Sequence, residues 1–145
     1  MEVYTIGFKG KTAAEFFGAL RQAGVKRVLD VRLNNTSHLA GFARKEHLPF
    51  FLKEICGAEY VHEPIFAPTE ELLDDYQAKK IKWGDYERRF TQILSERHVE
   101  EKIAPDYFSV PTALLCSETK ADKCHRRLVL EYLNSKWGSM SVVHL

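Results

Sequence analysis

The chain has 145 residues, of which 45% are hydrophobic and 28% charged, and these values are typical of one globular domain. A net charge of +1 excludes a strong overall attraction to nucleic acid or anionic lipid, and three cysteines are too few for a disulfide framework. No apolar run reaches the ~20 residues that span a bilayer, and the first residues lack a secretory signal pattern, so we expect a cytoplasmic protein with one domain, residues 1–145, and no membrane contact.

The first elements in chain order are a short strand and a capped helix. The apolar residues 3–6 indicate a strand that ends at Gly7. Thr12 and Glu15 have the spacing of a capping box, in which the threonine oxygen accepts a backbone N–H bond and the glutamate reaches back. Gly24 is typical of a helix end, so a helix is predicted between Thr12 and Gly24.

Further short apolar runs predict the other strands, and the run that ends at Cys116 has the clearest pattern of a buried strand. A helix is expected over residues 45–55, with its end near Gly57. A last helix is expected after Asp122, whose side chain is suited to cap it. The remaining strands are predicted at residues 25–32, 60–62, 112–116 and 141–145.

Residues 68–103 have a helical and acidic pattern. Thr69 is placed to cap a first helix, and a second helix is predicted over residues 83–101. We expect this segment to be an insertion that packs against one edge of the sheet. Three of its aromatic residues have helical spacing and are expected in the core: Trp83, Tyr86 and Phe90.

Strands that alternate with helices predict a mostly parallel sheet that is covered on both faces. The expected fold class is therefore α/β: a single Rossmann-like three-layer domain with extra helices from the central segment. In such a fold, the carboxyl ends of all parallel strands lie at one edge, and the loops that follow them form the ligand crevice.

Polar and reactive residues follow several of the predicted strands. Because those strand ends meet at one edge, we expect these side chains to surround a common crevice. This convergence is a stronger signal than any single motif. The residues concerned are Thr5, Gly7, Asp30, Arg32, Cys116, Glu118 and His144.

The sequence Cys124-His125-Arg126 adds an electrostatic signal. If Asp122 is the cap, these three residues occupy the first turn of the last helix, where free N–H groups and the helix dipole favour an anion. The same field lowers the pKa of a cysteine thiol and favours the nucleophilic thiolate. We therefore expect an anionic ligand near this turn.

These signals favour an enzyme that acts on a phosphate-bearing or nucleic-acid-derived ligand. Arg32 and Arg126 would bind the anion, with Thr5, Gly7, Cys124 and His144 as further ligand-binding residues. Cys116 or Cys124 would be the nucleophile, and Asp30, Glu118 or His125 would transfer protons. No cofactor is predicted. A cysteine-phosphatase loop is excluded, because it requires arginine six positions after the nucleophile, and that position is Asp122.

Simpler interpretations stay open for several of these residues. Cys116 is as readily a buried apolar side chain as a nucleophile. Asp30 and Arg32 could form a structural ion pair, as could Glu118 and Arg126.

Three other functions remain possible alternatives. A zinc site at Cys116, Cys124 and His125 has suitable ligand types, but adjacent helical residues point ~100° apart, so we predict no metal. A reversible Cys116–Cys124 disulfide lacks the usual redox spacing. A basic rim of lysines and arginines could instead serve a non-catalytic nucleic-acid or protein-interaction module.

The chain resembles the domain-of-unknown-function 488 family over essentially its whole length. The resemblance implies a Rossmann-type α/β fold whose activity is not established, with its site at the two cysteine motifs. It is carried, in chain order, by Tyr4-Thr5-Ile6-Gly7, Leu29-Asp30-Val31-Arg32, Phe42, Leu115-Cys116-Ser117-Glu118, Cys124-His125-Arg126 and Val143-His144-Leu145.

Overall fold

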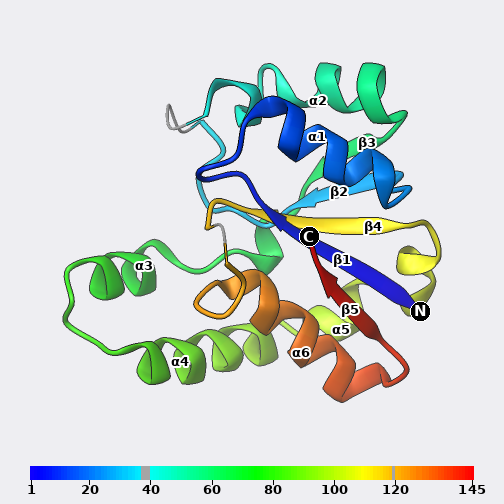
Figure 1. Ribbon diagram of the computed structural model, residues 1–145. Coiled ribbons are helices and arrows are strands. Elements are labelled where there is room, and N and C mark those ends of the chain that lie inside the picture. The colour runs from blue at the N-terminus through cyan, green and yellow to red at the C-terminus, as the bar shows by residue number, and fades with distance from the viewer. Residues whose placement is uncertain (37–39, 119) are drawn as a thin grey trace.

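A computed structural model describes residues 1–36, 40–118 and 120–145 of the chain (Figure 1). Within these residues, all paired strands run parallel and form one five-stranded sheet in the order β3-β2-β4-β1-β5. The predicted parallel sheet is confirmed, although the second strand is shorter than expected. The strands are β1 (Glu2–Gly7), β2 (Arg27–Asp30), β3 (Glu59–His62), β4 (Thr112–Cys116) and β5 (Ser141–His144).

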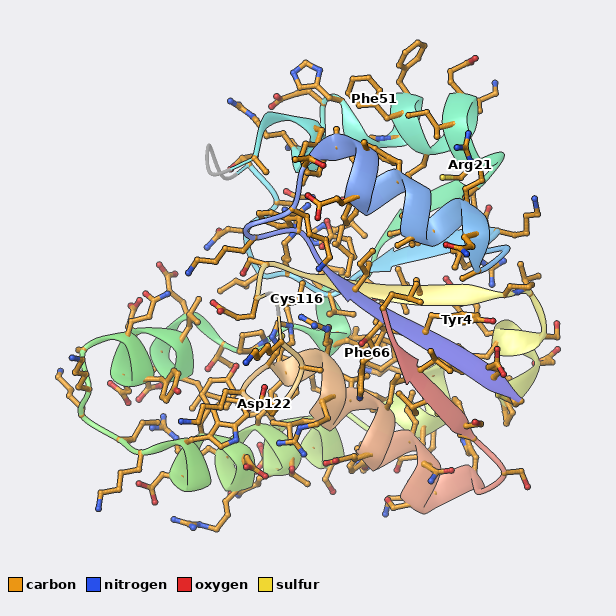
Figure 2. The ribbon with its side chains drawn as sticks, in the orientation of Figure 1. Tyr4, Arg21, Phe51, Phe66, Cys116 and Asp122 are labelled. Atoms are coloured by element: carbon orange, nitrogen blue, oxygen red, sulfur yellow. The ribbon has the colours of Figure 1, made fainter. Side chains whose placement is uncertain are left out.

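The central strand β4 is buried at every position, because helices cover both faces of the sheet. Its side chains alternate between two hydrophobic clusters. Leu114 and Cys116 belong to one cluster, whereas Ala113 and Leu115 belong to the other. Figure 2 shows Phe66, a member of the first cluster, on the opposite side of the sheet from the helices α1 and α2.

Helices lie in layers on both faces of the sheet, which confirms the three-layer α/β class (Figure 1). Apolar residues of α1 and α2 contribute to one hydrophobic cluster, and those of α3, α4, α5 and α6 contribute to the other. No described helix is long and apolar enough to cross a membrane. The helices are α1 (Ala13–Gln22), α2 (Leu48–Phe51), α3 (Glu70–Gln77), α4 (Trp83–Glu96), α5 (Val99–Lys102) and α6 (His125–Trp137).

The predicted caps of two helices are present. Thr12 and Glu15 form both hydrogen bonds of the capping box at the start of α1. Thr69 accepts a hydrogen bond from the backbone N–H of Leu72 at the start of α3. These caps satisfy backbone donors that have no partner within the helix.

The helix predicted over residues 83–101 is interrupted. It ends at Glu96, and the chain continues as α5 only after His98, which has a φ of 53°. A side chain rarely adopts this left-handed conformation, which ends the regular hydrogen-bond pattern. Helix α4 packs against α6 on a face of the sheet, and α3 packs against α4, so this segment does not lie at the edge as predicted.

Two other helix starts differ from the prediction. The helix expected from residue 45 begins at Leu48, where Pro49 is suited to the first turn, and it continues as a π-helical turn to Cys56. The last helix begins at His125, and Cys124 is its N-cap residue in place of Asp122. The backbone of Cys124 is extended, with φ −140° and ψ 140°.

The order of the strands creates a switch point between β1 and β4. These neighbours are parallel, but β1 continues into α1 on one face and β4 leads to α6 on the other. The loops after the two strands therefore diverge, and a crevice opens outside their carboxyl ends.

Candidate functional site

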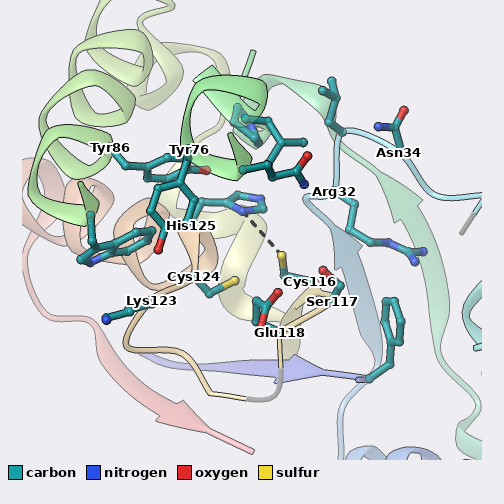
Figure 3. A pocket seen from close by; sticks show the side chains of 16 residues that line it. Arg32, Asn34, Tyr76, Tyr86, Cys116, Ser117, Glu118, Lys123, Cys124 and His125 are labelled. Atoms are coloured by element: carbon teal, nitrogen blue, oxygen red, sulfur yellow. Dashed lines mark hydrogen bonds between the residues drawn. The ribbon is translucent and has the colours of Figure 1, made fainter. Parts of the chain in front are cut away.

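A cavity of about 320 Å³ lies at the carboxyl edge of the sheet (Figure 3). Its walls come from the loops after β1, β2 and β4, from the start of α6, and from α3 and α4. Of the predicted site residues, Arg32, Cys116, Glu118, Cys124 and His125 line it. The structure therefore brings half of the predicted site into a single cavity.

Cys116, Cys124 and His125 form a compact buried cluster on the cavity wall. Their Sγ and ring nitrogen atoms all lie within 4.8 Å of one another. The Sγ atom of Cys116 is 3.5 Å from Nδ1 of His125, as the dashed line in Figure 3 shows. Nε2 of His125 is 2.6 Å from the carbonyl oxygen of Val31, which can only accept, so Nε2 carries a proton. Nδ1 faces Cys116, where it can accept a hydrogen bond from a thiol or, when it also carries a proton, donate one to a thiolate.

The two cysteines of this cluster differ in their pKa values. The pKa of Cys116 is lowered, first because Cys124 donates a hydrogen bond to it, and also because of the Arg126 charge and the backbone N–H groups of Ser117 and Glu118. These effects outweigh burial, which raises it. The pKa of Cys124 is raised, because its proton is held in the bond to Cys116. Cys116 is thus the more acidic thiol of the pair.

Arg126 holds the loop that follows β4. It is fully buried, and its guanidinium donates a 2.5 Å hydrogen bond to the carbonyl oxygen of Glu118. The same oxygen lies so close to Gly7 that a Cβ atom there would be 1.6 Å from it. Gly7 is therefore required by close approach of the backbone. The carboxylate of Glu118 lies 4.0 Å from Nζ of Lys9.

Asp30 and Arg32 form a buried ion pair. Oδ1 of Asp30 accepts from the backbone N–H and from Nε of Arg32, at 3.1 and 2.9 Å. Oδ2 accepts from a terminal nitrogen of Arg32 at 2.8 Å and from the Tyr60 hydroxyl at 2.6 Å. All four acceptor positions of the carboxylate are occupied. Its side chain points to the face covered by α1 and α2, so the structure does not group it with Cys116.

Thr5 and His144 are brought together where β1 pairs with β5. They are partners in the β1–β5 register, and Oγ1 of Thr5 is 2.5 Å from Nδ1 of His144. Burial and the charges of Arg126 and Arg127 lower the pKa of His144. Thr5, His144 and Arg126 are not among the residues that line the cavity.

Sequence patterns missed the aromatic part of the site. Phe90 and Tyr86 are core residues as predicted, and the ring of Phe90 lies edge-on to His125 at 5.5 Å between centroids. Trp83 and Tyr86 line the cavity, however, together with Tyr76 of α3. Helical spacing shows that such residues face inward, but it does not distinguish a packed core from a cavity wall.

The cluster also has the geometry of a possible metal site, contrary to the prediction that Cys124 and His125 point apart. That prediction assumed that both residues are helical, whereas Cys124 precedes α6 in an extended conformation. In a tetrahedral zinc site, bonds of about 2.3 Å to sulfur and 2.0 Å to nitrogen place the sulfur and the nitrogen about 3.5 Å apart. The Sγ atom of Cys116 and Nδ1 of His125 have this separation. Donation from the second ring nitrogen of His125 to a carbonyl is typical of metal-binding histidines.

We expect Gly7→Ala to destabilise the protein by about 1–3 kcal/mol, because the new methyl group overlaps the Glu118 carbonyl. Gly18→Ala is the matched control. Gly18 lies within α1, and a methyl group placed there would have none of the described neighbouring atoms within 4 Å, so the variant should gain roughly 0.5–1 kcal/mol. Urea unfolding measures both. Equal effects of the two substitutions would contradict the close approach at Gly7.

Asp30→Asn should lower the free energy of unfolding by about 3–5 kcal/mol, because it leaves the charge of Arg32 uncompensated in a buried position. Glu131→Gln removes one of the two carboxylates that pair with Arg127, at the surface, and should cost only about 0.3–0.5 kcal/mol. Chemical denaturation of both variants checks the difference. If Asp30→Asn lowers the free energy of unfolding by less than about 1 kcal/mol, the ion pair does not stabilise the loop after β2.

The comparisons with known proteins identify the family of the chain and give no further match. The model of the family described as "Domain of unknown function DUF488" matches residues 12–133. Comparison with curated proteins and comparison with solved structures both gave no match. Because the match includes β2, β4, both cysteine motifs and most of α6, the chain belongs to the DUF488 family.

Proposed function

We propose that the protein is an enzyme in which the Cys116 thiolate attacks an anionic ligand bound in the cavity. The observation that carries this proposal is the position of Cys116. Its side chain is only 5% exposed but lines the cavity, with Cys124 and His125 within reach. The fully buried Arg126 supplies a fixed positive charge nearby. This setting favours a nucleophilic thiolate.

The surrounding groups suit hydrolysis or group transfer at an electrophilic carbon. Sγ of Cys116 forms a bond to that carbon, and the leaving group departs with the electrons of the bond that breaks. His125 in its protonated form, or the thiol of Cys124, supplies a proton to the leaving group. Water or another acceptor then displaces the sulfur, and the proton released returns to the same group. The thiolate is thereby restored.

Positive groups near the cavity support an anionic, phosphate-bearing or nucleic-acid-derived ligand. Arg32 and Lys123 line the cavity from different elements. Glu118 lies on the same wall, with its side chain half exposed, where it can exchange protons with solvent. Asp30 is less suited to proton transfer than the sequence indicated, because Arg32 and Tyr60 occupy its carboxylate.

Thiol alkylation tests the proposal. Iodoacetamide should modify Cys116 at neutral pH. Because only the thiolate reacts, the midpoint of the rate plotted against pH should lie below the ordinary thiol pKa. Cys124→Ala removes the hydrogen-bond donor, so the Cys116 pKa should rise and the rate at neutral pH should fall. Cys56→Ser is the control. Cys56 donates to the Phe17 carbonyl in the other cluster, and its loss should leave the rate unchanged.

Absence of a reactive cysteine at neutral pH in metal-free protein would contradict the thiolate proposal. A rate that depends on Cys56 and not on Cys116 would do the same. Mass spectrometry of the modified peptides identifies the site in each variant.

A zinc centre is the second candidate, favoured by the spacing of the three donor atoms. Metal analysis of natively purified protein separates the two. If the protein contains stoichiometric zinc, and both Cys116→Ser and Cys124→Ser lose it, the thiolate proposal is rejected. The cluster is then a metal site with one position open to the cavity. Protein without metal, but with a reactive Cys116, would support the thiolate.

A further inference from the structure

The helices α3 and α4 give the cavity an aromatic wall that the proposed chemistry does not use. The rings of Trp83 and Tyr86 stack with centroids 4.9 Å apart and planes 13° apart. Tyr76 lies against both, at 5.5 and 5.2 Å. All three rings line the cavity, and only Tyr86 is fully packed, at 3% exposure. Part of the aromatic surface of Tyr76 and Trp83 is therefore available to a ligand.

The opposite side of the cavity is polar and positive. In Figure 3, Tyr76 and Tyr86 lie on one side of Cys116, and Arg32 and Asn34 lie on the other. One terminal nitrogen of Arg32 has no hydrogen-bond partner among the described residues, although the side chain is only 5% exposed. A buried guanidinium N–H without a partner is costly, and a small movement toward a bound anion would satisfy it.

The geometry points to a ligand with a planar aromatic ring on one side of Cys116 and an anionic group on the other. We propose that this ligand is a nucleotide, either free or at the end of a nucleic-acid strand. The ring would contact Tyr76 and Trp83, and the phosphate would lie toward Arg32. A cavity of about 320 Å³ admits one small molecule of this kind.

This inference rests on the proposed function for the use of the cavity as a ligand site, and it adds the chemical class of the ligand. The contacts of the ring do not require a reactive Cys116. Binding and thiol reactivity can therefore be tested separately, and each can fail while the other holds.

Calorimetric titration of the full-length protein tests the ligand class. The probes are the four common ribonucleoside monophosphates, ribose 5-phosphate, adenosine, and a short oligonucleotide with a 5′-phosphate. At least one nucleotide should bind roughly tenfold or more tightly than ribose 5-phosphate, which has no ring, and than adenosine, which has no phosphate. Tighter binding of the oligonucleotide than of any free nucleotide would identify a strand end as the source.

Two substitutions at one position locate the ring. Tyr76→Leu should weaken nucleotide binding roughly 5- to 100-fold, as loss of a stacking partner does, whereas Tyr76→Phe keeps the ring and should retain the affinity. Trp137→Phe leaves Trp83 as the single tryptophan of the chain, so that quenching of its emission reports ligand at the aromatic wall. Trp137 lies against Phe108, outside the residues that line the cavity.

Failure of all nucleotides to bind at millimolar concentration would overturn the inference, as would equal affinity for ribose 5-phosphate or equal effects of the two Tyr76 variants. Cys116→Ser separates this result from the proposed function. Nucleotide binding that persists in Cys116→Ser would support the ligand class, and a Cys116 that iodoacetamide does not modify in the unsubstituted protein would reject the nucleophile. A reactive Cys116 in a protein that binds no nucleotide would do the reverse.

Discussion

The site depends on one backbone oxygen, the carbonyl of Glu118, which lies against Gly7 and accepts a hydrogen bond from the buried Arg126. This contact joins the ends of two neighbouring parallel strands to the start of α6. It holds the loop whose N–H groups lower the pKa of Cys116, and it requires glycine at the end of β1. A charged donor makes such a bond strong, so the loop is fixed without further secondary structure.

The parallel sheet divides the polar residues at its edge between two faces. Cys116, Cys124 and His125 lie with the α6 layer, whereas Asp30 pairs with Arg32 toward the α1 and α2 layer. The two groups have different physical roles. The first contains acceptors and donors that face a cavity, and the second has a carboxylate whose bonding capacity is already used. Arg32 connects them, because it belongs to the ion pair and also lines the cavity.

The central helices α3 and α4 add an aromatic wall to the crevice at the strand ends. Helix α4 packs against α6, α3 packs against α4, and both place aromatic rings opposite the polar loops of the sheet. A site with both an apolar wall and a few converging polar groups is typical of small-molecule binding. The DUF488 family has no established activity, so the cavity itself is the basis for the proposed thiolate chemistry and for the proposed nucleotide.

The sequence by itself determined the α/β class, the parallel sheet, two helix caps and the region of the two cysteine motifs, because periodicity, capping residues and strand-end position are local signals. Tertiary structure alone decided that Cys124 precedes α6, that Asp30 and Cys116 face opposite ways, and that Trp83 lines a cavity. Each of these depends on contacts between residues distant in the chain. A helix start moved by two residues changes which side chains meet, and a local pattern does not resolve such a shift.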